Sequence, residues 1–292
     1  MKPAPFEYYA PDSLEQAVDL FSQYVGDGKI LAGGQSLVPA MNFRVVQPSV
    51  LIDLNRVGEL SYIREDGDVI RIGAMTRERQ LEFDSSIAKW TPLLHEAVPF
   101  IAHPQIRNRG TIGGSIVHAD PAAELPVLMT ALNARLKAKS VSGERWVDAK
   151  DFFVGMFTTA LEPNEILIEI ELPFMPARTG WSFVEVAPRA GDYAMMGVAA
   201  LVTLDANGKC KGAKLVYLNA GEGPMEAKEA EKLLEGTTLG DTLVEEAAVI
   251  ASEKEINPFG NTHASIDFQR HLAKVLTQKT LKLATQRAGE LQ

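Results

Sequence analysis

Apolar residues in the first part of the chain recur with two spacings, that of a helix and that of a strand. Between Leu14 and Phe21 they recur every three or four positions, directly after Asp12-Ser13, two residue types that cap helices. This stretch is therefore predicted to be a capped helix. The same reasoning predicts strands at 29–31, 50–54 and 69–72, helices at 92–98 and 122–132, and a half-buried strand at 166–172, where isoleucine and leucine alternate with other residues.

The pattern changes near residue 176, within a turn-rich stretch from Phe174 to Gly180. We therefore expect a first domain at 1–176 and a second at 177–292. The second domain should contain an antiparallel sheet with helices on one face, an α+β arrangement. Its expected strands are 181–186, 198–204 and 209–218, the last two joined by a hairpin at 205–208, and its expected helices are 227–234, 243–252 and 266–284.

Two glycine-rich segments are the strongest local chemical signal. They are Ala32-Gly33-Gly34-Gln35-Ser36 and Gly110-Thr111-Ile112-Gly113-Gly114-Ser115, and each is expected to follow a strand. Paired glycines leave backbone N–H groups free to approach a phosphate, so two such loops could hold the two halves of a pyrophosphate. The alternative is that each pair is a tight turn. Neither segment matches GxGxxG or GxxxxGK[ST], which disfavours a Rossmann site and a P-loop.

Composition removes several functional classes. The 38 acidic and 29 basic residues give a net charge of −9, which argues against nucleic acid or an anionic membrane as partner. No apolar run is long enough for a membrane span, and the N-terminus does not resemble a secretory signal. The single cysteine, Cys210, permits no intrachain disulfide, fits a reducing cytoplasm, and cannot ligate an iron–sulfur cluster alone. The five histidines have no metal-binding spacing, so no metal site is expected.

Three motifs resemble one family closely. LAGGQSLVPAMNFR (31–44), RNRGTIGGSIVHADPAAELP (107–126) and RAGDYAMMGVA (189–199) are similar to signatures of the FAD-binding medium subunit of molybdenum hydroxylases. That family includes carbon monoxide dehydrogenase and the quinoline, nicotine and xanthine dehydrogenases of the three-subunit type. The similarity covers essentially the whole chain, in order.

The resemblance implies an α+β fold in which two α/β FAD-binding subdomains of the vanillyl-alcohol-oxidase type, about 1–55 and 56–176, precede the C-terminal domain. It also implies a cytoplasmic electron-transfer subunit in a dimer of heterotrimers. The FAD would take electrons from [2Fe-2S] clusters on a small partner subunit, which receive them from a molybdenum cofactor on a large one, and pass them to an external acceptor. Flavin electron transfer needs no catalytic side chain, so none is assigned.

The resemblance also implies the cofactor-binding residues. It assigns both glycine-rich segments to FAD, places Ile101 near the flavin ring, and has Tyr193 cover that ring. Glu124 would bind the adenosine ribose, with Asp120 a second candidate nearby, and either Leu161 or Leu167 would line the adenine. The residues implied for the two segments are Ala32, Gly33, Gly34, Gln35, Ser36, Thr111, Ile112, Gly113, Gly114 and Ser115.

One position departs from the family pattern. Some relatives have lysine near Glu185, where it helps to hold negative charge on the flavin; Glu185 cannot do this, and Arg189 is the nearest cation in sequence. Arg107 and Arg109 are expected in a solvated turn, with contact to a cofactor phosphate or to the small subunit as the alternative. His118 is expected to be a structural hydrogen-bonding residue, and Cys210 a small buried apolar one.

Two other functions compete with the subunit role. A self-sufficient FAD-dependent oxidase of the same fold would need a substrate cavity with its own base, for which the sequence offers no candidate. A scaffold that has lost its flavin is disfavoured by the intact glycine-rich segments. The motif variants are closer to N-heterocycle hydroxylases than to carbon monoxide dehydrogenase, and the final acceptor stays open between NAD, a quinone, a cytochrome and oxygen.

Overall fold

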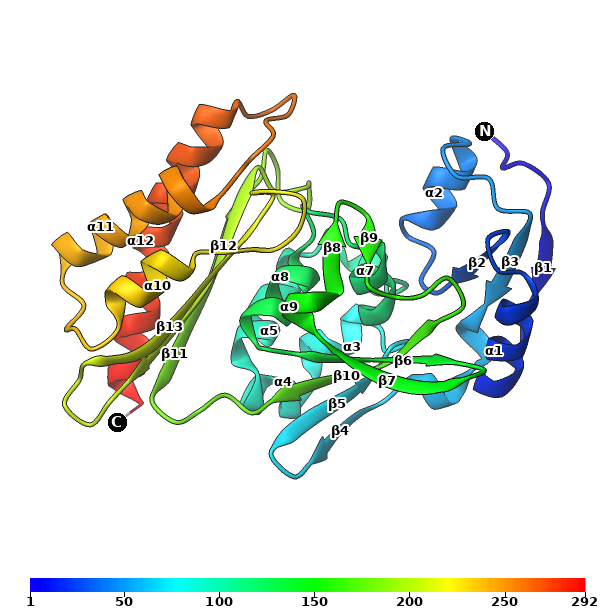
Figure 1. Cartoon of the computed structure of the whole chain (residues 1–292), viewed down its shortest axis with the longest axis horizontal. Coiled ribbons are helices and arrows are strands. Elements are labelled where there is room, and N and C mark those ends of the chain that lie inside the picture. The colour runs from blue at the N-terminus through cyan, green and yellow to red at the C-terminus, as the bar shows by residue number, and fades with distance from the viewer. Residues whose placement is uncertain (292) are drawn as a thin grey trace.

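The computed structural model describes residues 1–291, and three sheets follow one another along its long axis (Figure 1). A small N-terminal sheet lies at one end, a five-stranded sheet in the middle and the C-terminal sheet with its long helix at the other end. The fold is α+β, as predicted. Within the described residues, no helix is both long enough and apolar enough to cross a membrane.

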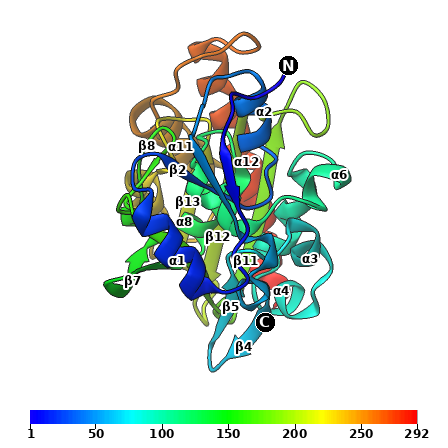
Figure 2. The ribbon, with the colours of Figure 1, turned by 90° about the vertical axis from the view of Figure 1, so that its right-hand side faces the viewer.

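The N-terminal sheet is parallel, in the order β1-β3-β2, and faces the viewer in Figure 2. Its strands are β1 (Glu7–Tyr9), β2 (Gly28–Leu31) and β3 (Val50–Asp53), with helices α1 (Leu14–Gln23) and α2 (Leu37–Asn42). Helix α1 begins as expected, because the Ser13 hydroxyl accepts a hydrogen bond from the Gln16 N–H. Two short 3₁₀ helices, η1 (Leu54–Arg56) and η2 (Gly58–Leu60), lead to the middle sheet.

The middle sheet is antiparallel, in the order β4-β5-β10-β6-β7. Its strands are β4 (Ile63–Asp66), β5 (Val69–Gly73), β6 (Arg135–Ser140), β7 (Gly143–Asp148) and β10 (Ile166–Pro173). Short helices gather on one side of it, and with them it encloses the largest core. They are α3 (Glu78–Phe83), α4 (Ser85–Trp90), α5 (Pro92–Ala97), η3 (Val98–Phe100), α6 (Pro104–Arg107), α7 (Ile112–His118), α8 (Glu124–Ala131) and α9 (Ala149–Phe152), followed by a hairpin of β8 (Phe153–Gly155) and β9 (Thr158–Thr159).

Strand β10 is not the half-buried strand that its alternation predicts. It is buried on both faces, because it lies in the centre of the sheet. A β-bulge between Leu167 and Glu169 changes which side chains share a face. Ile168 therefore packs with the N-terminal core, whereas Ile170 and Leu172 pack into the largest core.

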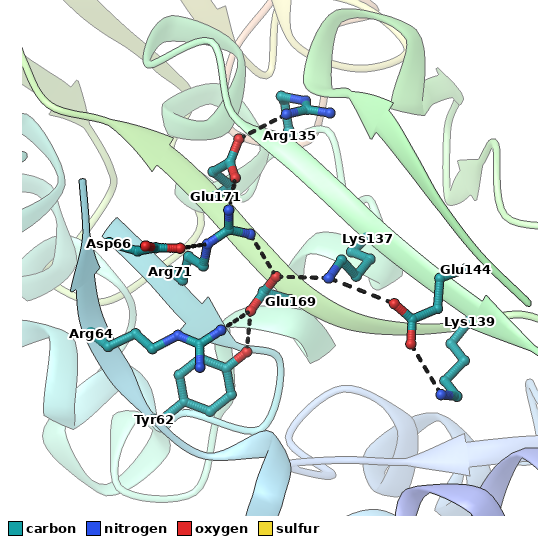
Figure 3. A network of polar contacts seen from close by, with 10 residues as sticks. All are labelled: Tyr62, Arg64, Asp66, Arg71, Arg135, Lys137, Lys139, Glu144, Glu169 and Glu171. Carbon is teal, nitrogen blue, oxygen red and sulfur yellow. Dashed lines mark hydrogen bonds and ion pairs between the residues drawn. The ribbon is translucent and has the colours of Figure 1, made fainter. Parts of the chain in front are cut away.

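Two buried glutamates of β10 organise an ion-pair network on the face of this sheet opposite the largest core (Figure 3). The Glu169 carboxylate contacts Arg71 at 3.0 Å and Lys137 at 3.2 Å, and it also accepts a hydrogen bond from the Tyr62 hydroxyl. Glu171 contacts Arg71 at 2.9 Å and Arg135 at 3.0 Å. Charged partners therefore link β10 to the strands on both of its sides.

The C-terminal sheet is antiparallel, in the order β11-β12-β13-β14, and the long helix α12 lies against β11 and β12. The turn at 205–208 joins β12 to β13, as predicted. Its strands are β11 (Thr179–Val186), β12 (Met196–Leu204), β13 (Cys210–Leu218) and β14 (Met225–Glu226), and its helices are α10 (Lys228–Leu234), α11 (Asp241–Ile250), the π-helical turn η4 (Ala251–Glu255) and α12 (Ile266–Glu290).

Candidate functional site

The second glycine-rich segment is held along an extended stretch that continues from β5. The N–H of Gly113 donates to Ala74 O at 2.9 Å, that of Ile112 to Thr76 O at 3.0 Å, and that of Glu78 to Gly110 O at 3.1 Å. The sequence suggested that this segment follows a strand, but it does not. It follows α6 and opens α7, whose cap Thr111 accepts a hydrogen bond from the Gly114 N–H.

The first glycine-rich segment touches the second. A Cβ on Gly33 would lie 2.5 Å from the carbonyl oxygen of Arg109, and one on Gly114 would lie 3.4 Å from the Cβ of Ala32. Gly34 has a φ of +74°, a conformation that other residues rarely adopt. The amide of Gln35 donates to the Gly33 carbonyl at 3.0 Å and so stays within its own turn. Backbone from two segments that lie far apart in the chain therefore meets at a place without side chains.

Arg107 is buried, which corrects its assignment to a solvated turn. Its side chain donates to Glu82 Oε2 at 3.0 Å and to the Ile101 carbonyl at 2.8 Å, and the residue is 5% exposed. The guanidinium thus fixes the backbone beside Ile101, which is itself buried. Arg109 acts through its carbonyl oxygen, which packs on Gly33 and accepts a hydrogen bond from Arg77.

The buried carboxyl groups of Glu78 and Glu124 and the half-buried carboxyl group of Glu185 have shifted pKa values near these segments. Burial, followed by the charge of Glu124, raises the pKa of Glu78 to about 8, and the same two causes raise the pKa of Glu185 to about 8. Burial, followed by the charge of Asp120, raises the pKa of Glu124 to about 7. Glu124 is therefore the charge that acts on both Glu78 and Glu185.

A cavity of about 360 Å³ lies between the η3–α6 segment and the connection from β11 to β12. Glu185 lines it, and the Oε2 atom of this residue is buried without a hydrogen-bond partner. His103 lies on the opposite wall and packs on Gly191. The full lining is Pro99, Phe100, Ala102, His103, Glu185, Ala187, Arg189, Ala190 and Gly191.

The remaining residues singled out by the sequence lie around this region or in the core. Asp120 Oδ1 accepts the Ala122 N–H at 2.9 Å in the turn before α8, and Tyr193 is 68% exposed beyond the cavity-lining loop. Leu167 is buried in β10, and Leu161 packs at the edge of the same core. In the part of the chain that the structure describes, His118 makes no side-chain hydrogen bond and contacts the Phe157 ring, contrary to expectation.

Some features of the region have no clear sequence signal. Glu78 is 4% exposed and its Oε2 has no partner, yet in sequence it resembles any acidic residue at a helix start. Cys210 is buried, as expected, and burial raises the pKa of its thiol to about 11. Among residues 1–291, no three His, Cys, Asp or Glu side chains gather as metal ligands would.

Comparison with known proteins decides the family. The model of the FAD binding domain in molybdopterin dehydrogenase matches residues 4–175, and that of the CO dehydrogenase flavoprotein C-terminal domain matches residues 181–284. The chain belongs to the FAD-binding medium subunits of molybdenum hydroxylases. Medium subunits of this family are oxidoreductase subunits that carry FAD, and the other cofactors of such complexes lie on partner subunits.

Individual relatives match over nearly the whole length. The 6-hydroxypseudooxynicotine dehydrogenase complex subunit alpha of Paenarthrobacter nicotinovorans is 43% identical over 288 residues, 99% of this chain and 97% of that protein. A carbon monoxide dehydrogenase chain from Hydrogenophaga pseudoflava superimposes with a TM-score of 0.95 at 38% identity, covering 98% and 99% of the two chains. A chain of quinoline 2-oxidoreductase from Pseudomonas putida 86 superimposes with a TM-score of 0.94 at 37% identity, covering 99% of each of the two chains.

Proposed function

We propose that this medium subunit carries electrons between the iron–sulfur clusters of a small partner subunit and an external acceptor. The observation that carries the proposal is the contact between the two glycine-rich segments, which leaves bare backbone from two distant parts of the chain in one place. FAD, when bound, supplies the ability to accept and release electrons, and the chain supplies position and electrostatics. Residues 1–176 would form the FAD-binding unit, with subdomains near 1–55 and 56–176, and residues 177–292 the C-terminal unit.

The residues present fit this cofactor. A pyrophosphate needs backbone N–H groups that no side chain blocks, and Ala32–Ser36 would meet that need. In Thr111–Ser115 the N–H groups from Ile112 to Ser115 already donate within the chain, so this segment would contribute close backbone approach and the Ser115 hydroxyl. Glu124 and Asp120 are carboxyl groups suited to ribose hydroxyls. Ile101 and Tyr193 would lie beside the flavin ring, and Leu161 or Leu167 beside the adenine.

The remaining cofactors must lie on other chains. Two [2Fe-2S] clusters need eight thiolates, whereas this sequence has one cysteine, which is buried. We therefore propose a cytoplasmic dimer of heterotrimers that contains an iron–sulfur small subunit and a molybdenum-cofactor large subunit. The relative named for 6-hydroxypseudooxynicotine and the quinoline enzyme support an aromatic N-heterocycle, or a compound derived from one, as substrate of the whole complex.

A self-sufficient FAD-dependent oxidase is the second candidate. The cavity favours it to the extent that Glu185, with its raised pKa, and His103 could serve there as bases. The cavity walls are otherwise largely alanine, proline and phenylalanine, without the set of polar groups that would orient an organic substrate. The subunit role therefore remains the better supported of the two.

Purification of the chain alone and with its partners tests these roles. We expect the isolated chain to bind FAD in a one-to-one ratio and to be reduced by dithionite, but not to oxidise quinoline, nicotinate or nicotine. Co-expression with a cysteine-rich small subunit and a molybdenum subunit should give a stable complex whose flavin is reduced by substrate. Oxidation of an N-heterocycle by the flavin-loaded single chain would establish the oxidase instead.

A further inference from the structure

The wall of the 360 Å³ cavity contains a carboxyl group that has no partner in the described chain. Glu185 lies on β11, and its Oε2 is buried without a hydrogen bond. A buried carboxylate without a partner is costly, so the group either stays protonated or meets a ligand. The cavity beside it offers space for such a ligand.

The two walls of the cavity come from the segments that the proposed function places beside the flavin ring. Phe100 and Ala102, on either side of Ile101, form one wall. The opposite wall ends at Gly191, two residues before Tyr193. The Arg107 guanidinium holds the first wall through the carbonyl of Ile101. A ring held by Ile101 and Tyr193 would therefore lie beside the two segments that form the walls of the cavity.

We propose that Glu185 is a cofactor-contacting residue whose neutral carboxyl group donates a hydrogen bond to an acceptor atom on the edge of the bound flavin ring. This inference rests on the proposed function. Flavin carbonyl and imine atoms are acceptors, so only the protonated carboxyl can pair with them; the ionised form would be repelled by their lone pairs. FAD binding should then require a protonated Glu185.

Several other groups could also produce a pH dependence. The charge of Glu124 raises the pKa of Glu185, and the charge of Asp120 raises that of Glu124 in turn. His103 and Arg189 also line the cavity, Tyr193 follows its lining residue Gly191 by two positions, and Glu96 lies near β11, where it accepts the Phe183 N–H. Glu96 is paired with Arg287 at 2.6 Å. The experiment must therefore separate Glu185 from Glu124 above all.

The test is the affinity of the apo-protein for FAD, measured by flavin fluorescence between pH 6 and pH 9.5. For the wild type we expect the Kd to rise above about pH 8, approaching tenfold per pH unit, the slope of one linked proton. Glu185→Gln keeps a donor that cannot ionise, so its Kd should stay flat over this range. Glu185→Met lacks the donor and should bind more weakly at pH 6, also without the rise.

Two controls make the outcome decisive. Glu15→Gln, on the exposed face of α1, should reproduce the wild-type profile. Glu124→Gln should move the rise to lower pH without removing it, because loss of a neighbouring negative charge lowers the pKa of Glu185. Parallel profiles for wild type and Glu185→Gln, or a rise abolished by Glu124→Gln alone, would overturn the proposal. A wild-type chain that binds no FAD at any pH would instead refute the proposed function.

The absorption spectrum of bound FAD gives a second measurement. A hydrogen bond at the ring edge shifts the visible bands, so Glu185→Met should change the spectrum at pH 6. A residue that served only to support the fold would change thermal stability and leave these bands in place. An unchanged spectrum together with unchanged affinity in Glu185→Met would exclude contact with the ring.

Discussion

Gly33 and Gly110 meet backbone to backbone, with no room for a side chain between them. A Cβ on Gly33 would lie 2.8 Å from the Cα of Gly110. Behind Gly110 lies the carboxyl group of Glu78, which would be 2.3 Å from a Cβ at that position. Two chain segments more than 70 residues apart are thus in contact at a place where neither tolerates a methyl group.

Adding a side chain to Gly33 should therefore open this contact. We expect Gly33→Ala and Gly34→Val to lose bound FAD while keeping most of their circular dichroism signal, because the altered backbone is on the surface that proposed phosphate contacts use. Gly212→Ala is the matched control, since a Cβ there meets nothing within 4 Å. Flavin content per chain after gel filtration provides the measurement, and full occupancy in both site variants would contradict the assignment.

Truncating Glu124 should weaken cofactor binding. Loss of hydrogen bonds to a charged group costs about 1–3 kcal/mol, so Glu124→Ala should raise the Kd of FAD correspondingly. The visible spectrum of bound flavin should change little, because the proposed partner is the ribose. Calorimetric titration of the apo-protein measures the affinity. An unchanged Kd would leave Glu124 as a residue that starts α8.

Glu169 should contribute stability that acid removes. Burial raises its pKa, but the Tyr62 hydroxyl, Lys137 and Arg71 outweigh this and leave the pKa lowered. A lowered pKa in the folded state means that the stabilisation is complete above the unfolded value of about 4.3 and disappears as pH falls through the folded value. The free energy of unfolding should therefore fall more steeply below about pH 4.3 in wild type than in Glu169→Gln.

Glu144→Gln is the control for this network (Figure 3). Its side chain is more exposed than that of Glu169, so its pairs with Lys137 and Lys139 should be worth about 0–1 kcal/mol. Glu169→Ala should cost toward the lower end of about 3–5 kcal/mol, because the cations left behind reach solvent. Urea denaturation of the two variants compares these costs. Equal losses of unfolding free energy in the two variants would show that the burial of Glu169 does not strengthen its ion pairs.

Arg107 should be a stabilising residue rather than a surface one. Arg107→Ala leaves the Glu82 carboxylate and the Ile101 carbonyl without their donor, and loss of one partner of a buried pair costs about 3–5 kcal/mol. Arg189→Ala, at a largely exposed arginine, should change stability by less than about 0.5 kcal/mol. Thermal unfolding of the apo-proteins compares the two, and similar midpoints would contradict the bracing role.

The pattern of apolar and polar residues predicted helices and strands well wherever neighbouring residues alone determine the local structure. Helix α1 with its Ser13 cap and the hairpin at 205–208 are examples, because spacing and turn residues act over a few positions. The sequence could not predict that side chains before and after the bulge in β10 lie on different faces of the sheet, since the bulge depends on pairing with β6. The burial of Arg107 likewise depends on Glu82, which lies on another helix.

The candidate site was predictable in residue type and not in arrangement. The glycine pairs stand out in the sequence, but their contact depends on the stretch 74–78, which pairs with 110–113 and carries no motif. Glu78 and the raised pKa of Glu185 arise from burial by distant segments, which spacing along the chain cannot report. Tertiary packing therefore determines the contact between the glycine-rich segments and the burial of these carboxyl groups.

The central position of β10 also has a consequence for synthesis on the ribosome. Hairpins β4–β5 and β6–β7 form from neighbouring residues, but each keeps an open edge until residues 166–173 enter between them. A nascent chain cannot close the middle sheet before that strand has left the exit tunnel. Fragments that end before residue 166 should consequently expose two unpaired strand edges, whereas fragments that end after 176 should have both edges paired.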